Sequence, residues 1–345
     1  LFYYIGWVLL KLESMLRNIH LMGGFARGCI KNLFQSWRSM IRFIPAIYPE
    51  PKEIQPVDNS NYLLESFDQR WEEYRATLKT CRAEFSEPAV HDLRVSTRRL
   101  LAVLEIIQAL DPQPRLRRLR RFLKNRLDGF DNLRDVQVML ASVSENSAAQ
   151  PALAPYKKYL EKKEKRLFRA AGKQVRAIKT NRFNRRMSRV REALLVLRGM
   201  ELPSKLLQLV DTAYQLVLER YALIDPANPA SIHRVRVAFK KFRYTLECVY
   251  PVVPGFPESQ FERMHAYQTL MGNIQDAQVF LQALAQYSHR HTELDLEPVR
   301  DLYEKYYEQA LFTYLDNRQE LHNFWRAVPK AAFPWNANPK IEAQL

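Results

Sequence analysis

The sequence predicts an all-α protein with two pseudo-symmetric antiparallel helical bundles related by an internal duplication. Three observations lead to this prediction. Glycine is scarce, with 9 residues in 345 against a usual share of roughly 7%. Apolar residues recur at helical spacing along most of the chain, and strand signals are nearly absent. One amphipathic pattern also occurs twice, starting at His91 and again 142 positions later at His233, which indicates a repeated unit.

Residues 1–44 differ from the rest of the chain. They combine charge-free runs of about ten residues with scattered basic residues, and a bilayer span needs about 20 apolar residues. A basic, aromatic-rich helix can instead lie on a membrane or granule surface. The alternatives are a helical extension that packs on the main domain and a natural start further downstream. Residues 45–58 contain four prolines and are predicted to be a linker.

Residues 59–325 are predicted to form the main domain, with repeat halves at about 60–181 and 202–323 and a connecting helix at 183–198. In the first half we expect helices at 60–85, 86–110, 115–128, 132–144 and from Pro151 or Pro155 to about 180. In the second half we expect helices at 202–224, 231–250, 258–271, from 273 onward and at 294–323. Short loops make sequential helices antiparallel neighbours. Residues 326–345 are predicted to be a loose tail.

Particular residues mark the helix ends. Ser86 and Asn228 are predicted N-caps, each with a proline in the first turn that follows. Gly129 and Gly272 are predicted helix stops. They separate each short helix from the helix after it.

A second repeated motif follows these glycines, with Asn132 and Asp135 in the first copy and Asn273 and Asp276 in the second. We expect each Asn to be an N-cap and each Asp to reach back to it. A helix start of this kind also presents backbone N–H groups to an anion. Asp135 and Asp276 are therefore predicted to support the site.

The repeated amphipathic pattern places cations on one face of each helix. The polar faces comprise His91, Arg94, Arg98 and Glu105 in the first copy, and His233, Arg236, Lys240, Arg243, Tyr244 and Glu247 in the second. The apolar faces comprise Leu93, Leu100, Leu104 and Ile107, and Val235, Phe239, Phe242, Leu246 and Val249. Because like charges at (i, i+4) spacing repel, two such helices favour one shared anionic ligand.

The net charge is +16, from 53 Lys and Arg against 37 Asp and Glu. Residues 151–200 hold sixteen of the basic residues and three of the acidic ones. A long basic helix is often only a solvated face. Here it occurs together with the two repeated basic helices, which favours a positive groove and a polyanionic partner. The arginines at 115–126 have few counterparts in the second half, so we expect the first half to bind more of the ligand.

The polar residues suit different roles. Imidazolium, the planar guanidinium of Arg and the mobile ammonium of Lys all bind phosphate oxygens. Glu105 and Glu247 are predicted to hold neighbouring arginines in place. Tyr244 either donates a hydrogen bond or packs at the edge of the groove.

Motifs of enzymes are few. The carboxylate–histidine motif of di-iron bundles occurs once, at Glu262 and His265, and no phosphate-binding loop, nucleophile elbow or zinc-protease motif is present. The three cysteines, at 29, 81 and 248, are scattered and predict neither a disulfide framework nor a zinc site. The sequence therefore predicts a protein that is not an enzyme and has no cofactor or metal.

The segments from His91 to Arg99 and from His233 to Tyr244 resemble the two signature helices of the CHAD family, the conserved-histidine α-helical domains. The likeness covers roughly residues 60–325. It implies two helical bundles around a basic groove that binds inorganic polyphosphate. The ligand set implied by the resemblance is His91, Arg94, Arg98, Arg99, His233, Arg236, Lys240, Lys241 and Arg243. Arg117, Arg121 and Lys124 of the short basic helix, and Tyr244, are expected to line the same groove.

The resemblance implies a non-catalytic polyphosphate-binding protein, cytoplasmic and associated with polyphosphate granules or with a polyphosphate-metabolising enzyme. A nucleic-acid binder is one alternative. Such proteins stack bases on aromatic side chains, and the polar faces of the two signature helices offer only Tyr244. A membrane- or granule-surface protein held by residues 1–44 is another. An enzyme that cleaves phosphoanhydrides through His91 or His233 is a third.

Overall fold

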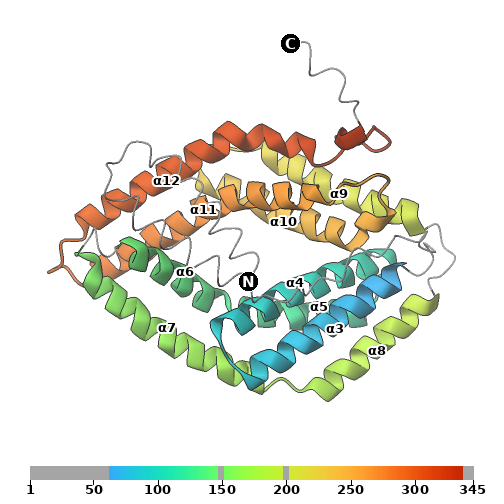
Figure 1. Cartoon of the computed structure of the whole chain (residues 1–345), viewed down its shortest axis with the longest axis horizontal. Helices are drawn as coiled ribbons and strands as arrows, with labels where there is room; N and C mark the ends of the chain where they lie inside the picture. The colour runs from blue at the N-terminus through green and yellow to red at the C-terminus, as the bar shows by residue number, and fades with distance from the viewer. Residues whose placement is uncertain (1–61, 147–150, 197–201, 337–345) are drawn as a thin grey trace, which may run out of the picture. The chain divides into compact units, whose positions relative to one another are not determined.

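The computed structural model describes residues 62–146, 151–196 and 202–336 (Figure 1). The chain divides into two units, Leu1–Val57 and Asp58–Leu345, and all that follows concerns the second. The predictions for residues 1–44 and 45–58, and for Cys29, lie outside the described residues. Every regular element in the described ranges is a helix, which confirms the all-α class.

Among the described residues, the first half contains five α-helices, α3 Tyr62–Ala83, α4 Glu87–Leu110, α5 Pro114–Asp128, α6 Asp131–Asn146 and α7 Leu153–Arg176. α8 Thr180–Val196 follows and leads to the second half. There the α-helices are α9 Leu202–Ala222, α10 Pro229–Val249, α11 Ser259–Ser288 and α12 Glu297–Asn317. Short 3-10 helices lie at η2 Tyr250–Val252, η3 Arg318–Asn323 and η4 Pro334–Asn336.

The N-caps of the two signature helices are as predicted. The Ser86 side chain accepts from the backbone N–H of Ala89 at the start of α4. The Asn228 side chain accepts from the backbone N–H of Ala230 at the start of α10. These bonds satisfy donors that a helix start leaves free, so both helices begin at fixed positions.

Four predictions about helix ends and the tail are wrong. α11 runs unbroken through Gly272 and Asn273, so this glycine stops no helix and this asparagine caps none. α6 begins at Asp131, which places Asn132 inside the first turn. The tail is also not loose at residues 326–336, because Arg326 binds a buried carboxylate in α9 and Phe333 is buried.

The apolar faces predicted for the signature helices are buried, as expected for amphipathic helices. α4 packs on α3, α10 packs on α9, and α4 and α10 pack against each other. Leu100 and Leu104 of α4, and Phe239 and Phe242 of α10, are fully enclosed. The two polar faces are thereby brought to one region between the halves.

A second core joins the far ends of the two halves. Side chains of α6, α7, α11 and α12 form it, and Phe280 stacks on Tyr303 with ring centroids 3.5 Å apart. The hydroxyl groups of Tyr303 and Ser142 are hydrogen-bonded at 2.7 Å. Because this core lies apart from that of α4 and α10, the halves are linked at two places.

Candidate anion-binding site

The cations of α4 and α10 lie close to one another. Lys240 is half-buried, and its pKa is lowered to about 7, first by burial and then by the charges of Arg98, Arg236, Arg94 and Arg243. Nearby like charges disfavour an ammonium ion, so these five cations from two helices form one group. We call Arg94, Arg98, Arg236, Lys240 and Arg243 the central cluster.

Arg94 is the most firmly held member of the central cluster. Its side chain is buried and donates to Asp131 Oδ1 at 2.9 Å and to the backbone carbonyl of Leu127 at 3.2 Å. Burial and the charge of Arg98 lower its pKa, and Asp131 opposes them. Arg94 therefore ties α4 to the start of α6, and its charge is partly neutralised.

Arg236 occupies the corresponding place in α10 but has a different environment. A Cβ on Gly272 would lie 3.7 Å from Arg236 Nη2, so the guanidinium packs against a position without a side chain. Arg236 Nε is buried and has no hydrogen-bond partner among the residues that the structure describes. Within the described ranges, Arg236, Arg98 and Lys240 form no ion pair with an acid.

Arg243 and Tyr244 border the cluster. Arg243 pairs with Glu247 at 3.3 Å and contacts His265 Nδ1 at 3.2 Å. Its guanidinium lies over the Tyr244 ring, 5.0 Å from the centroid, in cation–π geometry. Tyr244 thus packs at the edge of the cluster.

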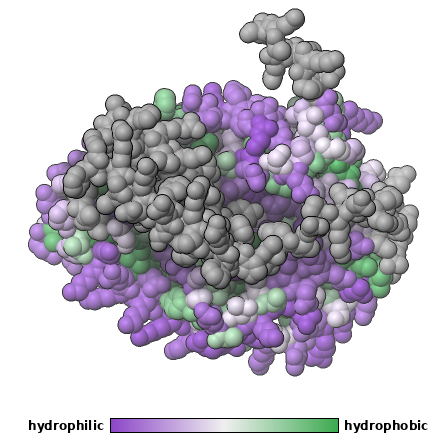
Figure 2. Space-filling model, viewed as in Figure 1, coloured by the Kyte–Doolittle hydropathy of each residue, from purple (hydrophilic) through white to green (hydrophobic). Residues whose placement is uncertain are grey.

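Two acidic residues also face the cluster. Burial raises the pKa of Asp276, while Arg236 and Arg134 oppose it. Burial also raises the pKa of Asp135, followed by the charge of Asp131. Solvent reaches both carboxylates, so they lie in a recess rather than in the core. Figure 2 shows a hollow with hydrophilic walls between the helices of the two halves.

The predicted capping roles of these two acids are wrong. In the described part of the chain, neither Asp135 nor Asp276 hydrogen-bonds to a helix start. In the first half, the acid that contacts the central cluster is Asp131, which pairs with Arg94. The first copy of the motif carries this acid where the second copy has Gly272.

Sequence reasoning missed Arg134. This residue of α6 is exposed, and its charge is the second cause, after burial, of the lowered pKa of His91. It also acts on Asp276, so it lies between the two halves beside the central cluster. Arg134 lies between the Asn and the Asp of the repeated motif, where the second copy has Gln275. Its place in that motif was a signal that it faces the site.

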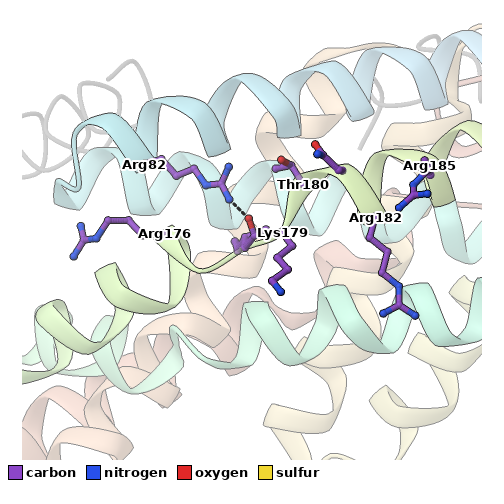
Figure 3. Close-up of a pocket in the computed structure, with 8 residues that line it drawn as sticks. Arg82, Arg176, Lys179, Thr180, Arg182 and Arg185 are labelled. Carbon is purple, nitrogen blue, oxygen red and sulfur yellow. Dashed lines mark hydrogen bonds between the residues drawn. The ribbon is translucent and has the colours of Figure 1, made fainter.

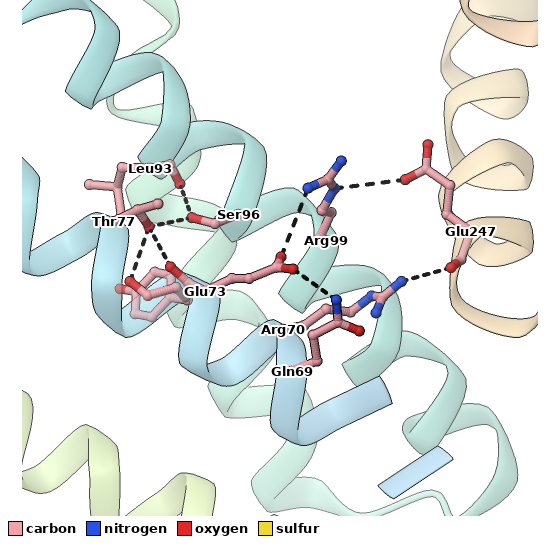
Figure 4. A network of polar contacts seen from close by, with 9 residues as sticks. Gln69, Arg70, Glu73, Thr77, Leu93, Ser96, Arg99 and Glu247 are labelled. Carbon is pink, nitrogen blue, oxygen red and sulfur yellow. Dashed lines mark hydrogen bonds and ion pairs between the residues drawn. The ribbon is translucent and has the colours of Figure 1, made fainter. Parts of the chain in front are cut away.

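Arg99 and Glu247 belong to a network that joins the halves (Figure 4). Arg99 lies 3.9 Å from Glu73 and 4.0 Å from Glu247, and Arg70 donates to the Glu247 backbone carbonyl at 2.7 Å. The carboxylate of Glu247 thus lies between Arg243 and Arg99. In the first half, Glu105 pairs with Arg120 of α5 at 2.7 Å.

The other predicted site residues are not brought into this group. Arg117, Arg121 and Lys124 are exposed on α5, and none is among the charges that shift the pKa of Lys240 or Arg236. His233 and Lys241 are exposed on α10. His91 is also exposed, but its pKa is lowered by burial and then by the charges of Arg134, Arg98 and Arg94, so it lies at the border of the central cluster.

Three further features bear on the chemistry. Over residues 62–146, 151–196 and 202–336, no group of three His, Cys, Asp or Glu side chains could hold a metal ion. None of the helices in these ranges is long and apolar enough to cross a membrane. Cys81 and Cys248 are buried free thiols.

Comparisons with known proteins place the chain in a family. The profile of the CHAD domain matches residues 65–285. The crystal structure of the CHAD domain from the plant Ricinus communis is similar, with 20% identity, a TM-score of 0.56, and coverage of 81% of this chain and 96% of that one. PptA from Streptomyces chartreusis is similar at 17% identity and a TM-score of 0.56, over 75% of this chain and 99% of that one. The search of curated proteins finds no match. The repeated basic helices, their meeting at Lys240 and the matched profile lead to one conclusion: the chain belongs to the CHAD domain family.

Proposed function

We propose that this protein binds inorganic polyphosphate in a groove whose cationic wall is the central cluster. The observation that carries the proposal is Lys240, whose pKa is lowered by burial and by the charges of four arginines from two helices. Such a group is unfavourable while empty, because the cations repel one another. A polyanion would relieve this repulsion and release its own counterions.

The three members without an acidic partner are the main contacts in this proposal. Arg98, Arg236 and Lys240 come from two helices, so one extended ligand would bridge the halves. The guanidinium groups match pairs of phosphate oxygens, and the ammonium acts as a mobile point charge. Arg94 would act chiefly by positioning α6, because Asp131 already pairs with it.

We further propose that the protein binds polyphosphate without cleaving it, in the cytoplasm and on polyphosphate granules. Incubation of long-chain polyphosphate with the protein and Mg²⁺ or Mn²⁺ should release no phosphate over hours. Release that disappears in the His91→Ala variant would assign the protein to the phosphoanhydride-cleaving enzymes instead.

The test of the binding proposal is competition. Long-chain polyphosphate should displace labelled polyphosphate from the full chain better than single-stranded or duplex DNA at equal phosphate concentration, and affinity should fall steeply with salt. The Arg98→Ala/Arg236→Ala variant should bind at least tenfold more weakly. The control is Arg290→Ala, at an exposed residue in the turn after α11, which should bind normally. Equal displacement by every polyanion would overturn the proposed specificity.

A further inference from the structure

A second group of arginines lies outside the central cluster, where α7 turns into α8. A cavity of about 610 Å³ opens there (Figure 3). Its charged lining residues are Arg82, Arg176, Lys179, Arg182 and Arg185. Thr180 and Asn181 of the first turn of α8 also line it, and the start of a helix carries partial positive charge.

A second cavity, of about 370 Å³, continues along α8. Its charged lining residues are Arg115 and Arg118 of α5, and Arg182, Arg185, Arg186 and Arg189 of α8. Arg182 and Arg185 line both cavities, so the two form one continuous surface. We call Arg115, Arg118, Arg182, Arg185, Arg186 and Arg189 the outer basic strip.

The packing of α8 explains why these arginines gather. Phe183 is buried against Trp71, Tyr74 and Phe122, with ring centroids 5.2 to 5.6 Å away. This contact fixes the apolar side of α8 toward α3 and α5. The four α8 arginines then fall within an arc of about 100° on one flank of the helix, over a length of about 10 Å.

Acidic residues avoid this surface. Neither cavity is lined by Asp or Glu, and no arginine of the outer basic strip forms an ion pair among the described residues. Arg191, on the other flank of α8, pairs with Asp68 at 2.9 Å. The arginines that line the two cavities thus differ from Arg191, which has an acidic partner.

Hydrogen bonds from Arg82 hold the backbone beside the larger cavity in place. Arg82 of α3 donates to the backbone carbonyl of Ile178 in the α7–α8 turn (Figure 3). It also donates to the backbone carbonyl of Val175 in the last turn of α7. These bonds satisfy carbonyl groups that a helix end leaves free. They also hold the α7–α8 turn in place beneath Arg182 and Arg185.

We propose that the outer basic strip and the adjoining cavity bind a compact oligophosphate, independently of any ligand in the central cluster. Arginine dominates the lining, and its planar fork matches paired phosphate oxygens. A concave surface without acids suits an anion that carries several charges over a few ångströms. The inference goes beyond the proposed function, since it adds a separate site on another face of the first half.

Inorganic tripolyphosphate is the probe, and titration calorimetry of the full chain at physiological salt is the measurement. The central cluster is disabled first, by Arg236→Ala/Lys240→Met. In that background we expect one remaining site for tripolyphosphate. Adding Arg185→Ala/Arg189→Ala should weaken its binding at least tenfold, whereas Arg166→Ala/Arg169→Ala removes the same charge from the exposed face of α7 and should leave it unchanged.

Two outcomes would overturn the inference. The first is the absence of any tripolyphosphate binding in the Arg236→Ala/Lys240→Met background. The second is an equal loss of tripolyphosphate affinity in the Arg185→Ala/Arg189→Ala and Arg166→Ala/Arg169→Ala variants, which would mean that only net charge matters. Failure of the proposed function is distinguishable, because Arg98→Ala/Arg236→Ala would then leave the binding of long polyphosphate unchanged while the outer basic strip still bound tripolyphosphate.

Discussion

The guanidinium of Arg236 packs against Gly272, with Nη2 3.7 Å from where a Cβ would lie. The equivalent arginine of the first half, Arg94, instead pairs with Asp131 at 2.9 Å. One copy of the repeat thus carries its own counterion, and the other has a cation whose buried Nε is unpaired within the described part of the chain. In our proposal the second copy therefore supplies the stronger contact to the ligand.

This asymmetry predicts the effect of one substitution. Gly272→Asp would place a carboxylate beside Arg236, as Asp131 does beside Arg94, and the 3.7 Å contact leaves room for the Cβ. We expect polyphosphate affinity to fall about tenfold. The slope of log affinity against log salt concentration should become shallower by roughly one released ion. Binding across a salt series measures both. Gly272→Asn has the same shape without the charge and should change affinity little; an equal loss in both variants would indicate a steric effect.

Much of the fold could be predicted from short-range sequence patterns. The buried faces of α4 and α10 follow from helical spacing, and the caps at Ser86 and Asn228 follow from side-chain chemistry near a proline. These features depend on neighbours within a few residues, so one sequence is enough to predict them.

Features that depend on tertiary packing were not predictable in this way. Gly272 looked like a helix stop, but it lies within α11, where it packs against Arg236 of another helix. The order of residues 326–336 depends on Asp211, more than 110 positions earlier. Arg134 reaches the site only because α6 lies between the two halves. None of these partners can be read from sequence spacing.

Lys240 should make binding depend on pH. Its pKa of about 7 in the free protein should rise when phosphate oxygens replace the neighbouring charges as its nearest partners. Binding at pH 8 should therefore take up nearly one proton, and affinity should increase as the pH falls from 8 to 6. Calorimetry in buffers with different ionisation enthalpies measures this uptake, with long chains used so that their end groups contribute little.

The variants Lys240→Arg and Lys240→Met separate charge from titration. Arg remains protonated, so binding by Lys240→Arg should stay tight and take up no proton at pH 8. Lys240→Met should lose both the affinity and the uptake. Full proton uptake in both variants would assign the titration to another group, and His91 would be the next to test.

The same lysine should limit stability. Its folded-state pKa, about 7, is below the ordinary value of 10.5, so between pH 7 and 10 the unfolded chain binds more protons. Stability then rises with pH through this window, and the cost of charging Lys240 is fully present below pH 7. We expect Lys240→Met to raise the free energy of unfolding by roughly 2 kcal/mol at pH 6, and by little at pH 10. Denaturant unfolding at both pH values measures the difference, and an equal gain at both would exclude a charge effect.

A buried ion pair should hold the end of the described chain on α9. Asp211 accepts from Arg326 Nε at 2.9 Å and Nη2 at 2.7 Å, and from Trp325 Nε1 at 2.8 Å. Asp211→Ala would leave a buried guanidinium without its partner and should cost about 3–5 kcal/mol of unfolding free energy. Asp68→Ala, which breaks the exposed pair with Arg191, should cost less than about 1 kcal/mol. A similar loss of unfolding free energy in the two variants would show that burial of the pair does not determine its contribution to stability.

Arg134 should contribute to binding although neither signature helix contains it. It is solvent-accessible and has no ion pair among the described residues, so Arg134→Ala should not unfold the protein. We expect a loss of polyphosphate affinity of roughly five- to thirtyfold, since a charge-assisted contact contributes about 1–2 kcal/mol. If one ligand contacts both Arg134 and Arg236, the double variant should lose less than the product of the two single losses, because removal of either contact loosens the other. Losses that multiply without coupling would place the two residues on separate ligands, and an unchanged affinity in Arg134→Ala would remove α6 from the site.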